Sequence, residues 1–242
     1  MQLKVVFKSD NPIVLPVHYN HIVQGFIYKV IDEKLADFLH NNGFGDKRKF
    51  KMFTFSRLLG KFDIKSKPKF IIFEDSVTLM VSSPYGKFCQ SFGNGIFKKK
   101  IFLGRNQLEV IEAELMPSIV IKDEIIVETL SPIVVYSTFI RPDGLKYTAY
   151  FQPKEKDFER LIYENLIKKY QAFNGSINYP EAKIEIEPLD QPKQNLIEYK
   201  GFIIKGYSGR FKINGPVELL QIGIDSGLGS KNSMGFGMIK IV

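Results

Sequence analysis

The order of apolar patterns along the chain restricts its fold more than any other feature. In the first half, strand-like stretches with alternating apolar residues surround two segments with helical apolar spacing. The expected strands lie at 3–7, 51–56, 69–73 (with 77–81 extending the last of these), 101–102 and 108–113, and the expected helices lie at 20–40 and 83–93. This order is βαββαβ, the ferredoxin-like unit.

The second half repeats this order. Its expected strands lie at 119–128, 133–136, 182–187, 198–204, 210–213 and 238–242, and its helices lie at 153–170 and from Pro216 onward. No low-complexity linker separates the halves, so we expect them to pack closely. The sequence therefore predicts an α+β fold of two tandem ferredoxin-like (βαββαβ, RRM-like) domains, residues 1–117 and 118–242, with a C-terminal glycine-rich loop.

Composition narrows the class of protein. A chain of 242 residues with 44% hydrophobic residues can bury the cores of two such domains. No stretch approaches the roughly 18 apolar residues of a membrane span, and the first residues lack the apolar core of a signal peptide. We therefore expect a cytoplasmic protein without a membrane partner. A single cysteine, Cys89, excludes an internal disulfide, and no spacing of His, Cys, Asp and Glu matches a metal site. We expect neither a metal nor another cofactor.

The net charge of +8 originates in one region. Residues 41–105 contain 14 Lys and Arg against 4 Asp and Glu, so this region carries +10 and the rest of the chain −2. It begins with Lys47, Arg48 and Lys49, and phenylalanines are interleaved through it. For any single lysine, a solvated position above a buried phenylalanine is the simpler interpretation. For the region as a whole, cations alternating with aromatic rings favour single-stranded nucleic acid, through phosphate neutralisation and base stacking.

A glycine-rich segment precedes the last expected strand. It runs from 227 to 237 and holds four glycines around Lys231. Backbone N–H groups in such a loop, with a lysine among them, form a concave site for phosphate. Loops that hold nucleotides lie between a strand and the N terminus of a helix, whereas this loop joins a helix end to a strand. The alternative is a tight connection in which Gly227 caps the helix.

Several of these segments together resemble one family. The pattern G-x-G-x5-G-F-G at 227–237 is similar, without a gap, to the signature loop of the CRISPR-associated repeat-RNA endoribonucleases, the Cas six family of the RAMP proteins. Residues 19–28 look like the first helix of that family. Residues 35–40 followed by 51–56 resemble the segment that bears its catalytic residues, and 130–132 resembles the opening of its second domain. The resemblance spans both halves, and the loop is its specific part.

The resemblance implies a fold and an activity. Family members have tandem ferredoxin-like domains and cut precursor CRISPR RNA within each repeat without metal. It implies attack by a ribose 2′-hydroxyl on the adjacent phosphate, leaving a 5′-hydroxyl and a 2′,3′-cyclic or 3′ phosphate. The positions that match the catalytic pattern of several members are Tyr28, His40 and Lys51. The implied partners are CRISPR repeat RNA and, further, an interference complex or a second copy of the chain.

The basic region and the loop would then grip the backbone of the RNA. The residues expected to bind it are Lys47, Arg48, Lys49, Gly227, Gly229, Lys231, Asn232, Gly235, Phe236 and Gly237.

The chemistry of the three matched residues fits this reaction. Internal transesterification requires a base for the 2′-hydroxyl, an acid for the leaving 5′ oxygen and positive charge near the phosphorane. Imidazole can act as the base or as the acid near neutral pH. A lysine ammonium can neutralise the negative charge of the transition state. Tyr28 can donate a hydrogen bond or orient the 2′-hydroxyl. His40, at a helix C terminus, suits the acid role.

Tyr28 and His40 can act on one phosphate only if the helix expected at 20–40 is interrupted between them. On one straight helix, Tyr28 and His40 would be about 18 Å apart at a rise of ~1.5 Å per residue. Asp32 is a good N-cap for a second short helix that begins at Glu33. We therefore predict an interruption at 32–34 that lets His40 fold back toward Tyr28, with the second helix ending at 41–43.

Two other functions stay open. One is a non-catalytic RAMP protein that only binds and delivers CRISPR RNA. The other is a tandem RRM-type RNA-binding module unrelated to CRISPR, which is disfavoured because the aromatic strand motif of RRM domains is absent. For His40 taken alone, a structural role is the simpler interpretation. His18 and His21 flank the start of the first helix, where either can cap or pack.

Overall fold

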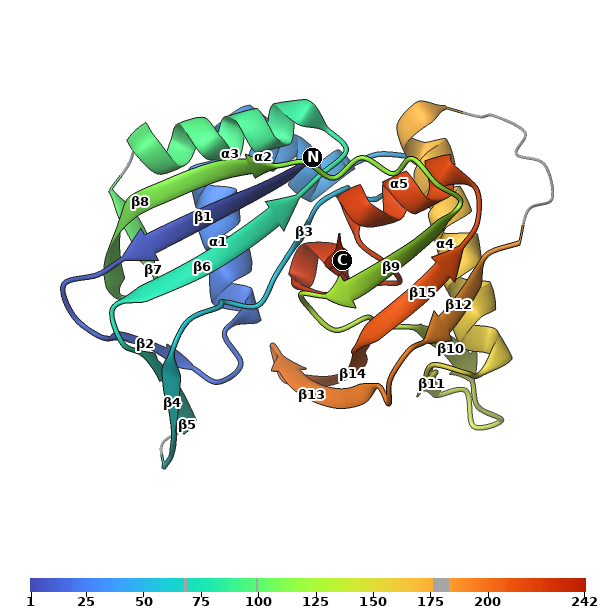
Figure 1. Ribbon diagram of the computed structural model, residues 1–242. Coiled ribbons are helices and arrows are strands. Elements are labelled where there is room, and N and C mark those ends of the chain that lie inside the picture. The colour runs from blue at the N-terminus through green and yellow to red at the C-terminus, as the bar shows by residue number, and fades with distance from the viewer. Residues whose placement is uncertain (68, 99, 176–182) are drawn as a thin grey trace.

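The computed structural model describes residues 1–67, 69–98, 100–175 and 183–242, and shows two α/β halves side by side (Figure 1). Lys99 of the basic region and the first residue of the strand expected at 182–187 lie outside the described residues. The elements of the first half are β1 (Gln2–Lys8), β2 (Ile13–Pro16), α1 (Asn20–Val30), α2 (Glu33–Asp37), the π-helical turn η1 (Phe38–Asn42), β3 (Thr54–Phe55), β4 (Phe62–Ser66), β5 (Lys69–Phe73), β6 (Ser76–Ser82), α3 (Gly86–Lys98), β7 (Ile101–Leu103) and β8 (Asn106–Met116).

The second half has a similar complement. Its elements are β9 (Glu124–Thr129), β10 (Tyr136–Ile140), β11 (Lys146–Tyr150), α4 (Lys156–Asn174), β12 (Glu185–Pro188), β13 (Lys193–Tyr199), β14 (Phe202–Ser208), β15 (Arg210–Asn214), α5 (Val217–Ser226), the 3-10 turn η2 (Asn232–Met234) and β16 (Ile239–Ile241).

The first sheet has the strand order β3-β6-β1-β8-β7, and all its pairs are antiparallel. Helices α1 and α3 cover one face of it (Figure 1). Phe7 of β1 meets Phe26 of α1 edge to face at 5.7 Å, and Phe26 meets Phe92 of α3 at 6.1 Å. Alternation on β1 and helical spacing on α1 and α3 thus bring the apolar side chains into one core.

The second sheet repeats the arrangement with the order β12-β15-β9-β16. In both halves the first strand of the unit lies between the third and the fourth, and the helices are α4 and α5 in the second. Phe158, Ile162 and Leu166 recur at helical spacing on α4 and are fully buried against this sheet. The predicted α+β fold of two tandem ferredoxin-like domains is therefore confirmed.

Additional strands account for several wrong predictions. Segment 77–81 does not extend β5, because a bend at 74–75 carries the chain from a separate sheet, β2-β5-β4, into β6 of the main sheet. The single strand expected at 198–204 is the turn of hairpin β13-β14, where Lys200 and Gly201 have φ of 49° and 84°. In the segment expected as a strand at 133–136, Ile133 and Val134 make only isolated bridges, and Tyr136 is the first residue of β10.

Glycines caused another error. The helix end predicted at Gly93 is wrong, because α3 continues to Lys98. A Cβ on the neighbouring Gly95 would lie 2.1 Å from the carbonyl oxygen of Val30. Glycine in α3 therefore permits close packing against α1. The strand expected at 51–56 shrinks to the two residues of β3, because Met52 adopts a left-handed φ of 53°.

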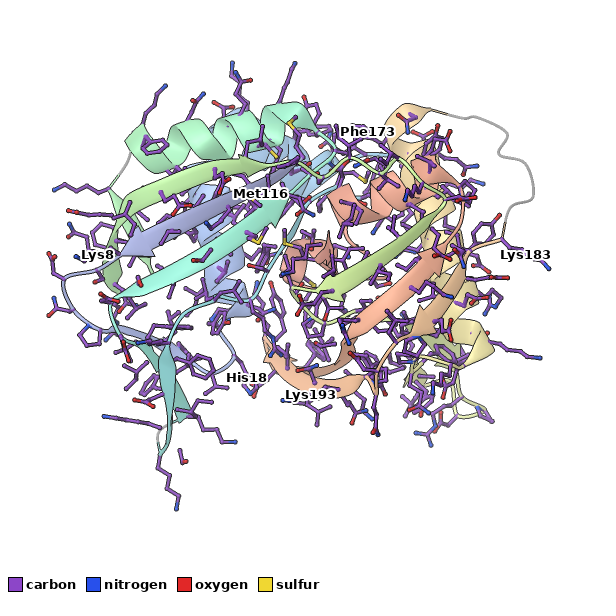
Figure 2. The ribbon with its side chains drawn as sticks, viewed as in Figure 1. Lys8, His18, Met116, Phe173, Lys183 and Lys193 are labelled. Carbon is purple, nitrogen blue, oxygen red and sulfur yellow. The ribbon has the colours of Figure 1, made fainter. Side chains whose placement is uncertain are left out.

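The C-terminal segment lies between the halves (Figure 1). The buried side chain of Gln2 donates hydrogen bonds to the carbonyl oxygens of Ile224 (3.3 Å) and Ile239 (2.9 Å). A small apolar cluster of Met80, Leu130 and Met238 joins the sheets, and Met116 packs on it (Figure 2). The halves are thus closely packed.

The boundary falls in the connection between β8 and β9. We propose to keep the division after residue 117, because β8 ends at Met116 and β9 begins at Glu124. His18 (labelled in Figure 2) contacts the second half near the end of β13, where its Nδ1 accepts a hydrogen bond from the Glu198 amide. None of the described helices is long and apolar enough to span a membrane.

Candidate active site

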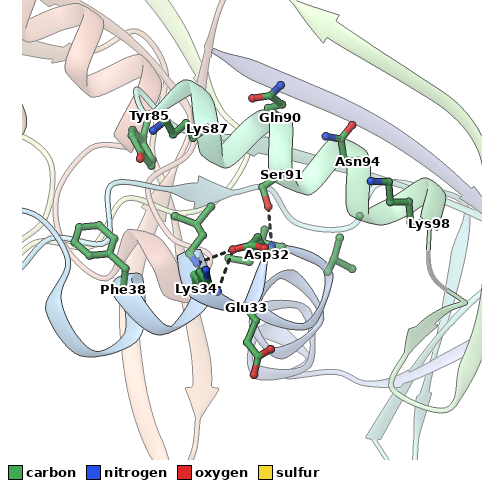
Figure 3. Close-up of a pocket in the computed structure, with 14 residues that line it drawn as sticks. Asp32, Glu33, Lys34, Phe38, Tyr85, Lys87, Gln90, Ser91, Asn94 and Lys98 are labelled. Atoms are coloured by element: carbon green, nitrogen blue, oxygen red, sulfur yellow. Dashed lines mark hydrogen bonds between the residues drawn. The ribbon is translucent and has the colours of Figure 1, made fainter.

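The break between α1 and α2 occurs at Asp32. Its Oδ1 accepts hydrogen bonds from the amides of Lys34 (3.0 Å) and Leu35 (3.2 Å), which is an N-cap, and its own amide donates to the hydroxyl of Ser91 (Figure 3). A short polar side chain in this position ends one helix and starts the next. The predicted interruption is confirmed.

The π-helical turn η1 then aims His40 back along α1. It ends at Gly43, whose φ of 65° is the left-handed conformation that terminates a helix. The rings of His40 and Tyr28 meet edge to face with centroids 6.2 Å apart, whereas one straight helix would separate these residues by about 18 Å. The predicted approach of His40 to Tyr28 is therefore confirmed.

Lys51 reaches the same place from the segment before β3. Its Nζ donates a hydrogen bond of 2.5 Å to the carbonyl oxygen of His40. Partial burial disfavours the charged form and lowers the pKa of Lys51 from its ordinary value. The structure thus brings together all three residues that the sequence matched to a catalytic pattern.

Tyr28 is held by aromatic neighbours. Its ring meets that of Phe53 edge to face at 5.7 Å. Burial, and then the nearby hydroxyl of Tyr199, raise the pKa of Tyr28 to about 12. Tyr28 therefore presents a neutral hydroxyl, a hydrogen-bond donor, at physiological pH.

The glycine-rich loop needs its glycines for two reasons. Gly227, Gly229, Gly235 and Gly237 all have φ between 66° and 85°, where a Cβ is strained. Space is also lacking, because a Cβ on Gly235 would lie 2.5 Å from the ring of Phe55, and one on Gly237 would lie 2.0 Å from the Leu228 carbonyl oxygen. Gly227 caps α5 as expected.

Two polar side chains hold the loop from within. Asn232 Nδ2 donates to the carbonyl oxygens of Leu228 and Phe236, both at 3.0 Å. Lys169 of α4, which is 2% exposed, donates from Nζ to Asn232 Oδ1 (2.7 Å) and to the Gly227 carbonyl (2.6 Å). These hydrogen bonds hold the backbone of the loop on both sides of the short turn η2.

The first half holds the loop from the other side. Asn20 Nδ2 donates to the Gly235 carbonyl (3.2 Å), and Gln24 Nε2 donates to the Ser233 carbonyl (2.7 Å). Gln24 precedes Tyr28 by four residues on α1, so the two side chains lie on the same face of that helix. The loop from the end of the chain is therefore anchored next to the Tyr28–His40–Lys51 group.

A pocket of about 120 Å³ lies between the loop and the segment that carries Lys51. Arg48, Lys49, Lys51, Lys169 and Lys231 line it, and none of the described residues lining it is Asp or Glu. A concave site with one sign of charge concentrates ligands of the opposite sign. The pocket is suited to an anion.

The other residues expected to bind RNA are placed as follows. Lys47 is exposed near the pocket segment, and Lys231 lies with its Nζ 5.0 Å above the ring of Tyr136. Two of the expected residues are also engaged within the loop, and their part in RNA binding stays a prediction. The ring of Phe236 is fully buried in a cluster with Val134. The side-chain amide of Asn232 donates a hydrogen bond to the Phe236 carbonyl oxygen within the loop. Both side chains therefore shape the loop.

The basic region does not form a continuous aromatic stripe. Phe50, Phe53 and Phe55 are buried, whereas Phe62 and Phe97 are exposed on separate elements, β4 and α3. Only the part of the region beside the loop belongs to the site.

Sequence reasoning missed the contribution of helix α4 and of Tyr199. Lys169 and Asn165 look like two polar residues on the solvent face of an amphipathic helix, but both are buried beside the loop. Tyr199 seemed to be a strand residue, yet its hydroxyl donates to the side chain of Gln24. A lysine and an asparagine four residues apart on a helix with an apolar face were the only available signal.

No cluster of three or more His, Cys, Asp and Glu that could hold a metal occurs among the described residues. A larger groove, about 760 Å³, lies between α2 and α3, and Figure 3 shows Lys34, Lys87 and Lys98 along it. Neither Tyr28, His40 nor Lys51 lines this groove, so we assign it no part in the chemistry.

Comparisons with known proteins identify the family of the chain. Residues 14–114 match the family model described as "CRISPR-associated protein Cas6, N-terminal", and residues 114–241 match "CRISPR associated protein Cas6, C-terminal". The chain belongs to the Cas6 family. The two Cas6 models meet at residue 114 and together account for nearly the whole chain.

Individual Cas6 proteins are similar over their full length. CRISPR-associated endoribonuclease Cas6 1 of Methanocaldococcus jannaschii is 30% identical over 99% of this chain and 92% of its own. A putative CRISPR-associated endoribonuclease-like protein Cas6 of Pyrococcus furiosus is 27% identical over 100% and 98%. A solved structure of a CRISPR-associated protein Cas6 superposes with a TM-score of 0.80 at 28% identity, covering 100% of this chain and 99% of that one.

Proposed function

We propose that this chain is an endoribonuclease that cleaves precursor CRISPR RNA within its repeats. The observation that carries the proposal is the convergence of the Tyr28 and His40 rings and the Lys51 ammonium beside the glycine-rich loop. The name of the M. jannaschii relative, a CRISPR-associated endoribonuclease, supports it.

The reaction is an internal transesterification without a metal ion. The ribose 2′-oxygen forms a bond to phosphorus, and the bond from phosphorus to the 5′ oxygen of the next nucleotide breaks. His40 delivers a proton to the leaving 5′ oxygen, while the proton of the 2′-hydroxyl passes to solvent. Lys51 neutralises charge on the phosphorane, and the neutral Tyr28 hydroxyl orients the reacting ribose. The products carry a 5′-hydroxyl and a 2′,3′-cyclic or 3′ phosphate.

The RNA lies across the junction of the halves. Lys47, Arg48 and Lys49 on one side of the pocket and Lys231 on the other neutralise its phosphates. Gly229 and its neighbours let the backbone approach closely. An interference complex and a second copy of the chain are further proposed partners, which bind surfaces outside this site.

Incubation of the purified protein with its repeat RNA in EDTA tests the proposal. We expect a single cut, and fragments whose downstream piece accepts a phosphate at its 5′-hydroxyl without prior phosphatase. Binding without any cut would instead assign the chain to the non-catalytic RAMP class. Cutting that stops in EDTA and returns with Mg²⁺ would contradict the metal-independent mechanism.

A further inference from the structure

Two buried polar side chains of α4 face the pocket without a role in the proposed chemistry. Asn165 and Lys169 lie one helical turn apart, are 5% and 2% exposed, and both line the pocket. They come from the second half of the chain, whereas Tyr28, His40 and Lys51 come from the first.

Lys169 is a buried cation without a described counter-ion. It forms no ion pair with any described carboxylate, and its Nζ donates only to neutral oxygens of the loop. Burial, and then the charge of Arg48, lower the pKa of Lys169 well below its ordinary value. A buried charge is costly unless it is paired, and an anion in the pocket would supply the partner.

Asn165 offers the opposite kind of group. Its Oδ1 is buried and has no hydrogen-bond partner among the described residues. Such an acceptor is rare in folded proteins, because the hydrogen bonds to water that it loses on burial are not replaced. A ligand that completes this site therefore brings anionic oxygens for the cations and one hydrogen-bond donor for Asn165.

A ribose phosphate of RNA has both groups, in its phosphate oxygens and its 2′-hydroxyl. The pocket volume of about 120 Å³ is too small for a whole drug-sized ligand, which takes roughly 300 Å³ or more. Lys51 lines the pocket, but Tyr28 and His40 do not. The occupant is thus adjacent to the cleaved linkage and distinct from it.

We propose that the pocket is a subsite for one uncleaved ribose phosphate next to the scissile linkage, in which the Arg48 guanidinium binds the phosphate, Lys169 adds positive charge beside it, and Asn165 accepts a hydrogen bond from the 2′-hydroxyl. This inference rests on the proposed function. Through the 2′-hydroxyl, α4 would distinguish RNA from DNA at a nucleotide that is not cleaved.

The test uses repeat RNA made uncleavable by one deoxynucleotide at the cut position. A second deoxynucleotide is then moved along the neighbouring positions, and the dissociation constant is measured for each RNA. With the native chain, we expect one neighbouring position at which the second deoxynucleotide weakens binding about 5- to 10-fold, as the loss of one hydrogen bond predicts. Asn165→Leu should weaken binding of the RNA that carries only the deoxynucleotide at the cut position by a similar factor, and should abolish the sensitivity at the neighbouring position.

Two controls separate this role from folding. Because Asn165→Leu removes an unsatisfied buried acceptor, its melting temperature should equal or exceed that of the native chain. Asn94→Leu, at an exposed position on α3, should keep the full sensitivity. A neutral methylphosphonate at the sensitive nucleotide should weaken binding in the native chain and should weaken it less in Arg48→Met, because Lys169 is then the remaining positive charge at the phosphate.

The outcomes distinguish the two proposals. Normal cleavage of all-ribose RNA without any sensitive neighbouring position overturns the subsite and leaves the proposed function intact. Sensitivity that survives Asn165→Leu also overturns it. Failure to bind repeat RNA at all overturns both.

Discussion

Lys51 donates its hydrogen bond to the backbone carbonyl oxygen of His40, eleven residues earlier in the chain, and so leaves the imidazole itself unengaged by the lysine. The bond spans the turn that follows η1 and holds the Lys51 ammonium against the backbone of His40. Tyr28 completes the group through its ring contact with His40. A proton carrier, a cation and a neutral donor at one place are the requirements of metal-free RNA transesterification.

Replacing His40 by alanine should remove the proton donor and leave RNA binding intact. We expect the single-turnover cleavage rate to fall by about 10²–10⁴-fold, the usual contribution of positioned proton transfer, with the dissociation constant changed less than about threefold because a single exposed side chain is lost. His21→Ala, also at an exposed histidine of the first half, is the matched control. Equal rates for the native chain and His40→Ala would remove His40 from the mechanism.

Tyr28→Phe tests the role of the neutral hydroxyl. Loss of one hydrogen bond made in the transition state should lower the rate by about 10- to 100-fold. Because the pKa of Tyr28 is raised to about 12, its hydroxyl keeps its proton through the assay range. The shape of the rate–pH profile between pH 6 and about 10 should therefore be the same in both proteins. If the rate of the native chain rises with pH and this rise is absent in Tyr28→Phe, the deprotonated tyrosine acts as a base.

Lys51→Arg tests the cation. Burial lowers the pKa of Lys51, so its ammonium loses charge at a lower pH than an ordinary lysine, and activity should fall as pH rises through that value. The arginine side chain keeps its positive charge throughout the assay range. The variant should be slower near neutrality, because the guanidinium fork has another geometry, but should lack this alkaline decline. Lys87→Arg, at an exposed lysine of α3, should keep it.

Gly237→Ala tests the support of the loop. A Cβ there meets both a left-handed φ of 74° and an oxygen at 2.0 Å. We expect a loss of about 2–5 kcal/mol in the free energy of unfolding, from backbone strain and overpacking together. Gly144→Ala is matched in φ (80°) but has nothing within 4 Å of its Cβ, so only the strain of about 1–2 kcal/mol remains. Equal losses, measured by urea denaturation, would show that the close contact does not matter.

The sequence predicted the fold well where local chemistry decided the structure. Asp32 could be identified as a cap because its carboxylate satisfies amides within its own turn, and this local effect placed His40 against Tyr28. Gly227 was identified as a helix cap for the same reason.

Prediction failed where distant contacts decided. Gly93 does not end a helix, because α3 continues to Lys98 and packs closely against Val30 at Gly95. The sequence also did not indicate that Val134 and Lys169, from other elements, contact the side chains of Phe236 and Asn232 in the glycine-rich motif. Such contacts join residues far apart in the chain, and no local pattern records them.

The central claim is that the 2′-hydroxyl of the RNA is the nucleophile in the Tyr28–His40–Lys51 site and that no metal ion takes part. Its most direct test is a repeat RNA with a single 2′-deoxynucleotide at the cut position, incubated with the native chain in EDTA. The account predicts unchanged binding, no cleavage of this RNA, and cleavage of the all-ribose RNA to a 2′,3′-cyclic phosphate. Cleavage of the deoxy-substituted RNA at the same linkage, with a free 3′-hydroxyl on the upstream fragment, would contradict it.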